Sequence, residues 1–149
     1  MHALPSALVA PIDATLADTE AFCSAYDVAL EASANCIVVA ARRGQITVYA
    51  AVMVLATGRA DINKTVRKHL GARRITFAAP EETQSATGMQ SGGITPVGLP
   101  RGWPILIDRA VAVSELVVIG GGVRGSKILA PGPEVAALPG AEVLDLTLP

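Results

Sequence analysis

The residues best suited to chemistry lie in the middle of the chain, beginning with a basic segment. Its six cations face a single acid, Asp61, which leaves a net charge of +5 over residues 59–74: Arg59, Lys64, Arg67, Lys68, Arg73 and Arg74. Most charged surfaces are merely solvated, but they usually mix both signs, so an uncompensated cluster favours a phosphate-bearing partner. The first chemistry indicated is therefore polyanion binding.

Two glycine-rich segments follow. Gly92-Gly93-Ile94-Thr95-Pro96 has adjacent glycines, which allow positive φ and let backbone N–H groups approach an oxyanion or a carboxyl ester; a tight turn is the alternative. Residues 120–125 match G-x-G-x-x-G, but a dinucleotide fingerprint needs a helix where residues 126–130 look like a strand. We expect a hairpin here, either bringing Arg124 toward a site or serving as a structural turn.

Covalent and metal chemistry have little support in the sequence. Cys23 and Cys36 have no neighbouring histidine to activate them and are predicted to be small buried hydrophobes. Two distant histidines without an acidic cluster argue against a metal site. Ser91 and Ser126 lie in no recognisable nucleophile motif. The residues themselves therefore predict no metal site.

The overall composition hides an uneven distribution of charge. The 149 residues have a net charge of −1, yet all 12 basic residues lie between Arg42 and Lys127. Because that range contains only five acids, its net charge is +7. The flanks hold the other eight acids. Aromatic residues make up 3%, too few for a base-stacking platform. RNA contact would therefore use the backbone and chain end.

The periodicity predicts the elements that must position these residues. Strands are expected at 7–10, 36–40, 46–55, 74–78, 104–108, 115–119 and 126–130, with 36–55 forming a buried hairpin. Helices are expected at about 16–26, with Leu16, Phe22 and Ala25 inward, at 62–70 after an Asp61 cap, from Pro80, and as a turn at 133–138. The pattern indicates one mixed α/β domain spanning residues 1–149.

Four motifs, in order, resemble one family. They are Ala60-Asp61-Ile62-Asn63-Lys64, Gly92-Gly93-Ile94-Thr95-Pro96-Val97-Gly98, Ile105-Leu106-Ile107-Asp108 and Gly121-Gly122-Val123-Arg124-Gly125. Between about Cys36 and Pro131 the chain resembles the YbaK/ProX aminoacyl-tRNA deacylases, relatives of the editing domain inserted in bacterial prolyl-tRNA synthetases. The resemblance implies a mixed, mostly antiparallel sheet, curved like a barrel and surrounded by helices. It implies no metal and no organic cofactor.

The resemblance also implies site residues. A lysine matching Lys64 is the residue most tied to activity in that family, and the loop matching Gly92–Pro96 shapes the pocket around the aminoacyl group and terminal adenosine. Many relatives carry a lysine before the first central strand, where this chain has Asn35. The substrate-binding set is predicted to be Asn35, Thr95, Pro96, Asp108, Gly121, Gly122 and Arg124.

The leading hypothesis is hydrolysis of an amino acid ester from mischarged tRNA in trans. A bound water would attack, the Gly92 and Gly93 N–H groups would stabilise the oxyanion, and Lys64 would position the acceptor end. Asp108 and Arg124 are expected to form an ion pair. Arg59, Arg67, Lys68, Arg73 and Arg74 would bind tRNA, and either Arg67 or Lys68 could replace Lys64 in the pocket.

Two other functions compete with this one. A non-catalytic module could bind tRNA or an aminoacyl-tRNA synthetase on the same fold, and a nucleotide-binding protein could use residues 120–125. No DNA or membrane partner is expected: residues 46–55 are too rich in β-formers for a helix-turn-helix, and no apolar run approaches the roughly 20 residues of a membrane span. We expect a cytoplasmic monomer or homodimer.

Overall fold

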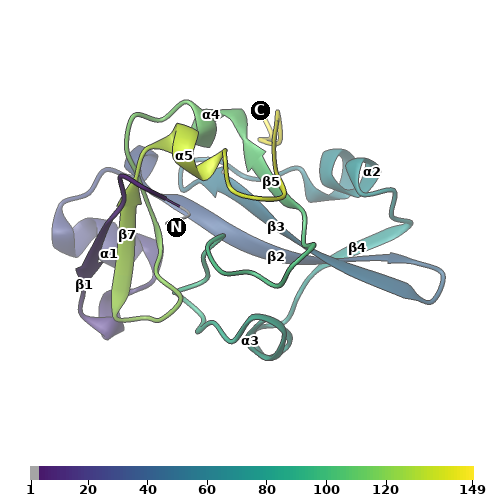
Figure 1. Ribbon diagram of the computed structural model, residues 1–149, viewed down its shortest axis with the longest axis horizontal. Helices are drawn as coiled ribbons and strands as arrows, with labels where there is room; N and C mark the ends of the chain where they lie inside the picture. Colours follow the sequence, from purple (N-terminus) through teal and green to yellow (C-terminus); the bar gives the residue numbers. More distant parts are fainter. Residues whose placement is uncertain (1–3) are drawn as a thin grey trace.

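The computed structural model describes residues 4–149 and arranges them as two open sheets with helices around them (Figure 1). The strands are β1 Leu8–Pro11, β2 Ala34–Arg43, β3 Ile46–Leu55, β4 Arg74–Phe77, β5 Ile105–Asp108, β6 Val117–Gly120, β7 Ser126–Ala130 and β8 Ala141–Leu144. The α-helices are α1 Thr19–Tyr26, α2 Arg67–His69, α3 Pro80–Thr87, α4 Arg109–Ala112 and α5 Gly132–Val135. The remaining helical segments are the 3-10 turns η1 Ala14–Leu16 and η2 Leu30–Ala32 and the π-helix η3 Ile62–Val66.

The larger sheet has the strand order β4-β2-β3-β5-β8, and the smaller one has the order β1-β7-β6. Strand β5 runs parallel to β3 and β8, whereas every other pairing between these strands is antiparallel. A single parallel bridge between Ser33 and Val118 connects the two sheets among the described residues. The predicted mixed α/β fold class is confirmed, with sheets that do not close into a barrel.

Alternation along β3 explains why the larger sheet is buried on both faces. Ala51 and Met53 face a core shared with the smaller sheet, which supplies Val117 and Ile119. The intervening Val52 faces a second core, covered by η3. Successive strand residues point to opposite faces, so an apolar run such as β3 is what a sheet covered on both sides requires.

The β2–β3 hairpin is predicted correctly, but it is not buried throughout. Its inner half is enclosed, whereas Ile46 and Val48 near the turn are 68% and 46% exposed. The end of the hairpin projects beyond the rest of the molecule (Figure 1). Long β-branched runs specify strands well, but they do not reveal how far the covering layers extend.

The helices differ from the predictions at their ends. The expected helix over residues 16–26 is broken at Ala17 and Asp18, because Asp18 has an extended backbone (ψ 141°) that begins α1; Ala25 is exposed rather than inward. The Asp61 cap is confirmed, since its carboxylate accepts a hydrogen bond from the Lys64 N–H at 3.2 Å. The short elements α4 and β8 were not predicted.

The glycine-rich segment after β6 is a hairpin turn, as predicted. Strand β7 follows it directly and pairs antiparallel with β6, so no helix begins at the third glycine. The dinucleotide-binding fingerprint is therefore absent from this segment. No helix among residues 4–149 is long and apolar enough to cross a membrane.

Candidate functional site

A cavity of about 320 Å³ lies where the two sheets meet. The start of α1, the start of β2, the loop at Gly92, the end of β6 and Lys127 of β7 form its walls. Ser33 and Val118, whose bridge connects the sheets, both line it. The cavity thus brings together the two glycine-rich segments that were separate in sequence.

Backbone packing explains the glycines on both sides of the cavity. The Gln90 N–H donates to the Gly122 carbonyl at 3.1 Å, and the Gly122 N–H donates to the Gly93 carbonyl at 2.6 Å. A Cβ at Gly93 would overlap the Val123 backbone, and one at Gly120 would overlap the Ile94 carbonyl oxygen. These glycines are needed because the two loops touch backbone to backbone.

The same packing changes which N–H groups can meet a ligand. The Gly93 N–H donates to the Gln90 carbonyl at 2.8 Å, so it cannot serve an oxyanion as predicted without breaking that bond. Within residues 4–149, the N–H groups of Gly92 and Ile94 donate to no protein acceptor, and both residues line the cavity. The loop therefore still offers two backbone donors, one of them at a different residue.

Arg124 does not line the cavity, and its side chain instead holds the Gly92 loop in place through hydrogen bonds. Its guanidinium donates to the Ser91 carbonyl at 2.9 Å, the Ala14 carbonyl at 3.0 Å and the Asp18 carboxylate at 3.3 Å. The predicted ion pair with Asp108 is wrong. The Asp108 carboxylate is buried elsewhere, where it accepts from backbone N–H groups near the C-terminus.

Lys127 is a cavity residue that the sequence analysis missed. Its ammonium donates to the Ala17 carbonyl at 2.8 Å and to the Gly92 carbonyl at 3.3 Å, and lies 5.2 Å from the centre of the Phe22 ring. Burial lowers the pKa of this ammonium. The available signal was a lone lysine in an apolar strand, in register with Gly120 across the hairpin.

Asn35, which is predicted to bind substrate, also lines the cavity. Its Oδ1 accepts a hydrogen bond from the Thr19 hydroxyl at 2.6 Å. The amide NH₂ is consequently the part of the side chain left to donate to a ligand. Together with Lys127, Gly92 and Ile94, Asn35 makes this cavity rich in hydrogen-bond donors.

Four other predicted site residues lie in the loops after α3 and β6 and do not line the cavity. Thr95 and Pro96 are buried, and the Thr95 hydroxyl accepts from the Val97 N–H at 3.4 Å. Gly121 packs against Ser126, and Gly122 bonds to the loop as described above. None of these four residues lines this cavity, and Pro96 lines a different one, of about 530 Å³.

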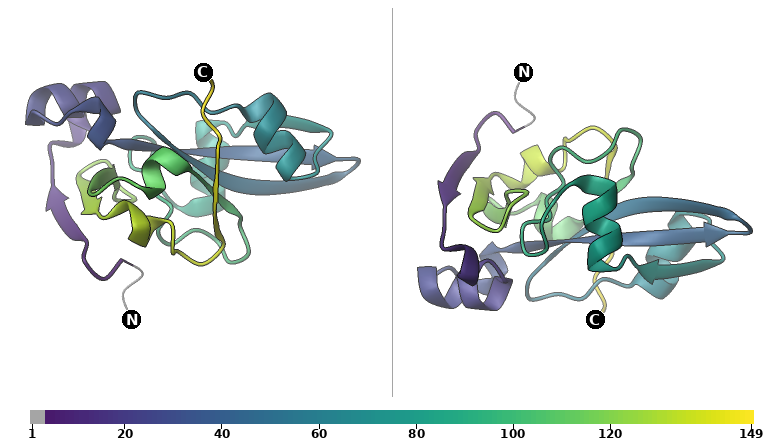
Figure 2. Two further views of the ribbon diagram at one scale, coloured as in Figure 1. Left: turned by 90° about the horizontal axis from the view of Figure 1, so that it is seen from above. Right: turned by 90° about the horizontal axis from the view of Figure 1, so that it is seen from below.

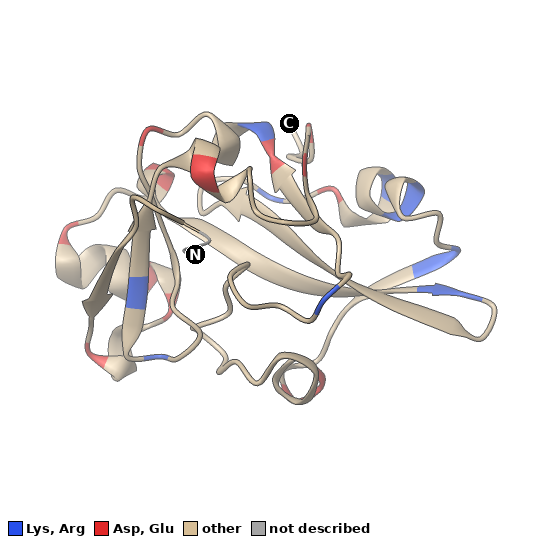
Figure 3. Ribbon diagram, in the orientation of Figure 1, with Lys and Arg blue, Asp and Glu red and all other residues tan. Residues whose placement is uncertain are grey.

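The basic segment lies at the other end of the molecule. Helix α2 and η3 are far from α1 and β7 in all three views (Figures 1 and 2), so the structure does not bring Lys64 to the cavity. Arg67 folds back, with its Nε donating to the Asn63 carbonyl at 2.8 Å. Basic residues gather over α2, β4 and the adjoining hairpin (Figure 3), where Lys64, Lys68, Arg73 and Arg74 are exposed. Arg59, before η3, is exposed too.

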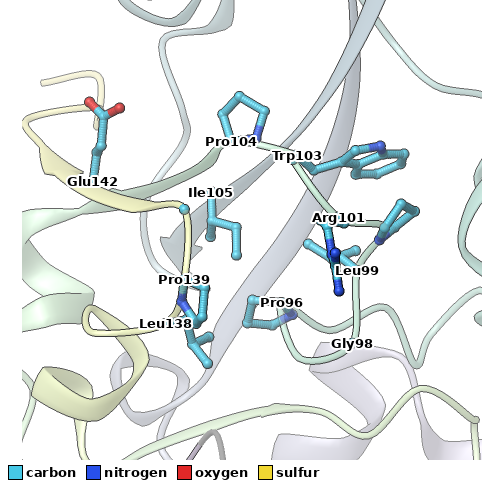
Figure 4. Close-up of a pocket in the computed structure, with 13 residues that line it drawn as sticks. Pro96, Gly98, Leu99, Arg101, Trp103, Pro104, Ile105, Leu138, Pro139 and Glu142 are labelled. Carbon is cyan, nitrogen blue, oxygen red and sulfur yellow. The ribbon is translucent and has the colours of Figure 1, made fainter.

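A second cavity, of about 530 Å³, is larger but chemically poorer (Figure 4). Prolines and Trp103 dominate its wall, and the Trp103 ring stacks on Tyr49 with 5.3 Å between centroids. Of its two charged lining residues, Glu142 is paired with His69 at 2.9 Å, which leaves Arg101. The donor-rich cavity is therefore the better candidate for ester chemistry.

The cysteines do not provide a nucleophile. Burial raises the pKa of both thiols, and that of Cys36 to about 12, so both stay protonated near neutral pH. Cys23 is buried as predicted, whereas Cys36 is only half-buried and lines the cavity. Among residues 4–149, no cluster of three His, Cys, Asp or Glu side chains could hold a metal ion.

Comparisons with solved structures identify the fold. A candidate trans-editing enzyme for prolyl tRNA synthetase superposes with a TM-score of 0.81 at 24% identity, covering 96% of this chain and 87% of that one. A hypothetical protein superposes with a TM-score of 0.85 at 20% identity, covering 96% of this chain and 92% of that one. At these identities the similarity establishes the fold alone.

The sequence itself identifies the family. The model of the aminoacyl-tRNA editing domain matches residues 13–138, a range that contains the Gly92 loop, Asn35, Lys127 and the basic segment. The resemblance inferred from the four motifs is thereby confirmed. This chain belongs to the family of aminoacyl-tRNA editing domains.

Proposed function

We propose that this protein is a free-standing deacylase that hydrolyses the ester of mischarged aminoacyl-tRNA in the cavity beside Gly92. The supporting observation is the pair of unengaged N–H groups, at Gly92 and Ile94, in the wall of a donor-rich cavity. Membership of the editing-domain family agrees with this reaction. The substrate would be an amino acid esterified to the terminal ribose.

In this mechanism, a water oxygen bonds to the ester carbonyl carbon, and the carbonyl oxygen becomes an oxyanion. The Gly92 and Ile94 N–H groups stabilise that oxyanion, since preorganised donors act most strongly where charge develops. The bond between the carbonyl carbon and the ribose oxygen then breaks, the ribose oxygen takes up the proton that the water gave up, and the amino acid leaves as the free acid. Water is the only co-reactant.

Proton transfer requires a group other than the cavity carboxylate. Asp18 is the one acidic residue among the described cavity-lining residues, and Arg124 already pairs with it. We assign the proton relay to the neighbouring ribose hydroxyl of the tRNA, which is adjacent to the ester by its covalent structure. This assignment explains how the reaction can proceed without a protein general base.

The basic surface would bind the body of the tRNA. Lys64, Lys68, Arg73 and Arg74 are exposed at the end of the molecule away from the cavity, so a long polyanion could contact both. In this proposal Lys64 contributes to phosphate binding and does not touch the reacting ester. Arg59 and Arg67 contribute to the same surface.

The decisive experiment is deacylation of tRNAs mischarged with small amino acids, including alanine, serine and cysteine. We expect hydrolysis of at least one ester, with Lys64→Ala and Arg67→Ala raising KM and leaving kcat nearly unchanged. Absence of hydrolysis across the panel would contradict the proposal. A loss of kcat in Lys64→Ala would return that lysine to the reaction centre.

A non-catalytic binding module remains the second candidate, because the Gly93 N–H is already engaged and the cavity contains no unpaired carboxylate among its described residues. Such a protein would bind tRNA, or a synthetase carrying it, without turnover. A salt-dependent tRNA titration beside the deacylation assay separates the two functions. Tight binding with no hydrolysis would favour the module.

A further inference from the structure

The cavity contains a positive charge that no carboxylate neutralises directly. Lys127 makes no ion pair among the described residues, and the nearby Asp18 carboxylate is bonded to Arg124. The lysine side chain is half-buried. Burying an ammonium in this way is costly unless polar partners surround it.

Those partners are incomplete. An ammonium has three N–H donors, of which two reach the carbonyls of Ala17 and Gly92. These carbonyls belong to separate segments, so they hold the ammonium between α1 and the Gly92 loop. The third N–H donor has no protein acceptor among the described residues.

The surroundings of Lys127 suit an anionic ligand. The same cavity wall carries the Asn35 amide and the unengaged N–H groups of Gly92 and Ile94. Lys127 pairs in register with Gly120 of β6, which also lines the cavity. Four donor groups, one of them charged, therefore line this cavity, and Asp18, its one acid in the described part of the chain, is already paired.

We propose that Lys127 binds an anionic oxygen at the aminoacyl end of the tRNA. This inference rests on the proposed function for the identity of the ligand. The oxygen belongs either to the terminal phosphodiester or to the oxyanion formed at the ester. Each group carries one negative charge on oxygen and can accept a hydrogen bond from one ammonium N–H. The phosphodiester would contact Lys127 before the reaction begins, whereas the oxyanion forms only during it.

The test compares Lys127→Met, which keeps the stem and removes the charge, with Lys127→Arg, which keeps the charge. Arg109→Met is the control, because Arg109 is exposed and its one ion pair within residues 4–149 is with Asp145. Each variant is assayed for kcat, KM, affinity for uncharged tRNA and thermal unfolding. A charge-assisted hydrogen bond predicts about a 10- to 100-fold loss in kcat/KM for Lys127→Met.

The kinetic split identifies the oxygen. A rise in KM with weaker binding of uncharged tRNA indicates the phosphodiester, whereas a fall in kcat with unchanged binding indicates the oxyanion. In either case Lys127→Arg should recover most of the loss, and Arg109→Met should match the wild type. Unchanged kcat, KM and affinity in folded Lys127→Met would overturn the inference.

Two further outcomes also decide the matter. A purely structural role would lower the unfolding temperature of Lys127→Met and leave kcat/KM per folded molecule unchanged, which overturns the inference. If the wild type hydrolyses no ester, the proposed function fails, and affinity for uncharged tRNA alone decides. Weaker binding in Lys127→Met than in Arg109→Met then supports Lys127 as an anion-binding residue, and equal binding overturns it.

Discussion

Gly120 shows how one residue fixes the shape of the cavity. A Cβ there would overlap the Ile94 carbonyl oxygen, so Gly120→Ala must push the Gly92 loop away from β6. We expect a loss of about 1–3 kcal/mol in the free energy of unfolding. Urea denaturation measures this loss.

Gly125→Ala is the matched control, because the atom nearest to a Cβ at Gly125 would be the Ile12 carbonyl oxygen, at 3.8 Å. Equal losses of unfolding free energy in both variants would refute the packing argument.

Cys36 makes the stability of the protein depend on pH. Its pKa is raised from 9.0 to about 12 in the folded state, so the unfolded chain loses this proton first as pH rises. The protonated thiol therefore contributes fully to the free energy of unfolding below pH 9, and this contribution falls as pH rises toward 12, by up to about 1.4 kcal/mol per pH unit. Cys36→Ala has no thiol and so lacks this pH-dependent contribution.

Urea denaturation of the wild type and Cys36→Ala across this pH range measures the effect. The difference in unfolding free energy between the two should fall steadily above pH 9, while other titrating groups cancel in the comparison. A constant difference from pH 8 to pH 11 would show that the thiol is not desolvated.

Among elements, the C-terminal segment is held partly by the Asp108 carboxylate of β5 and partly by backbone hydrogen bonds to Arg59 and Asp61. Asp108 Oδ1 accepts from the Leu146 N–H at 2.8 Å and the Thr147 N–H at 3.2 Å, and Oδ2 accepts from the Ala110 N–H at 3.3 Å. Asp108→Ala leaves these three N–H groups without an acceptor. It should lower the free energy of unfolding by about 2–4 kcal/mol, since each buried group left unsatisfied costs roughly 1–3 kcal/mol. Thermal or urea unfolding measures the loss.

Asp145→Ala is the control for this prediction. That carboxylate is exposed and pairs with exposed Arg109, an interaction expected to contribute below about 1 kcal/mol. Asp108→Asn, which keeps one acceptor oxygen, should fall between the two. A loss in Asp108→Ala no larger than in Asp145→Ala would mean that the segment is held in another way.

The predictability of the elements follows their length and chemistry. The β2–β3 hairpin was predicted because its strands are long and β-branched, and η3 with α2 because Asp61 caps them. Strand β8 was missed because its four residues gain their place from pairing with β5, which is a tertiary contact. The break at Asp18 was missed too, because the Asp18 side chain makes no capping hydrogen bond at the start of α1.

Over the whole molecule, the separation of charge predicts how tRNA binding responds to salt. Replacing Lys64, Lys68 and Arg74 with Gln should lower the slope of log affinity against log salt by roughly 2, because each phosphate contact contributes about 0.7–0.9. Filter binding at several salt concentrations measures the slope. Replacing Arg101 and Arg109 is the control, since neither lies in residues 59–74.

A slope that falls equally in both sets of variants would indicate that net charge, and not this surface, governs binding.

The sequence predicted the basic surface because charge can be counted along a chain. It did not predict the cation of the cavity: Lys127 enters only because β7 lies beside β6 and the Gly92 loop, contacts that arise after folding.

Among the described residues, the two sheets that form the cavity are joined by strand pairing at one point, the bridge between Ser33 and Val118 in the cavity wall. Elsewhere the sheets are held together by the packing of their shared core, so the width of the cavity depends mainly on side-chain contacts. Lys127 and Asn35 belong to different sheets, in β7 and β2. A ligand bound to both would hold the two sheets at one fixed angle.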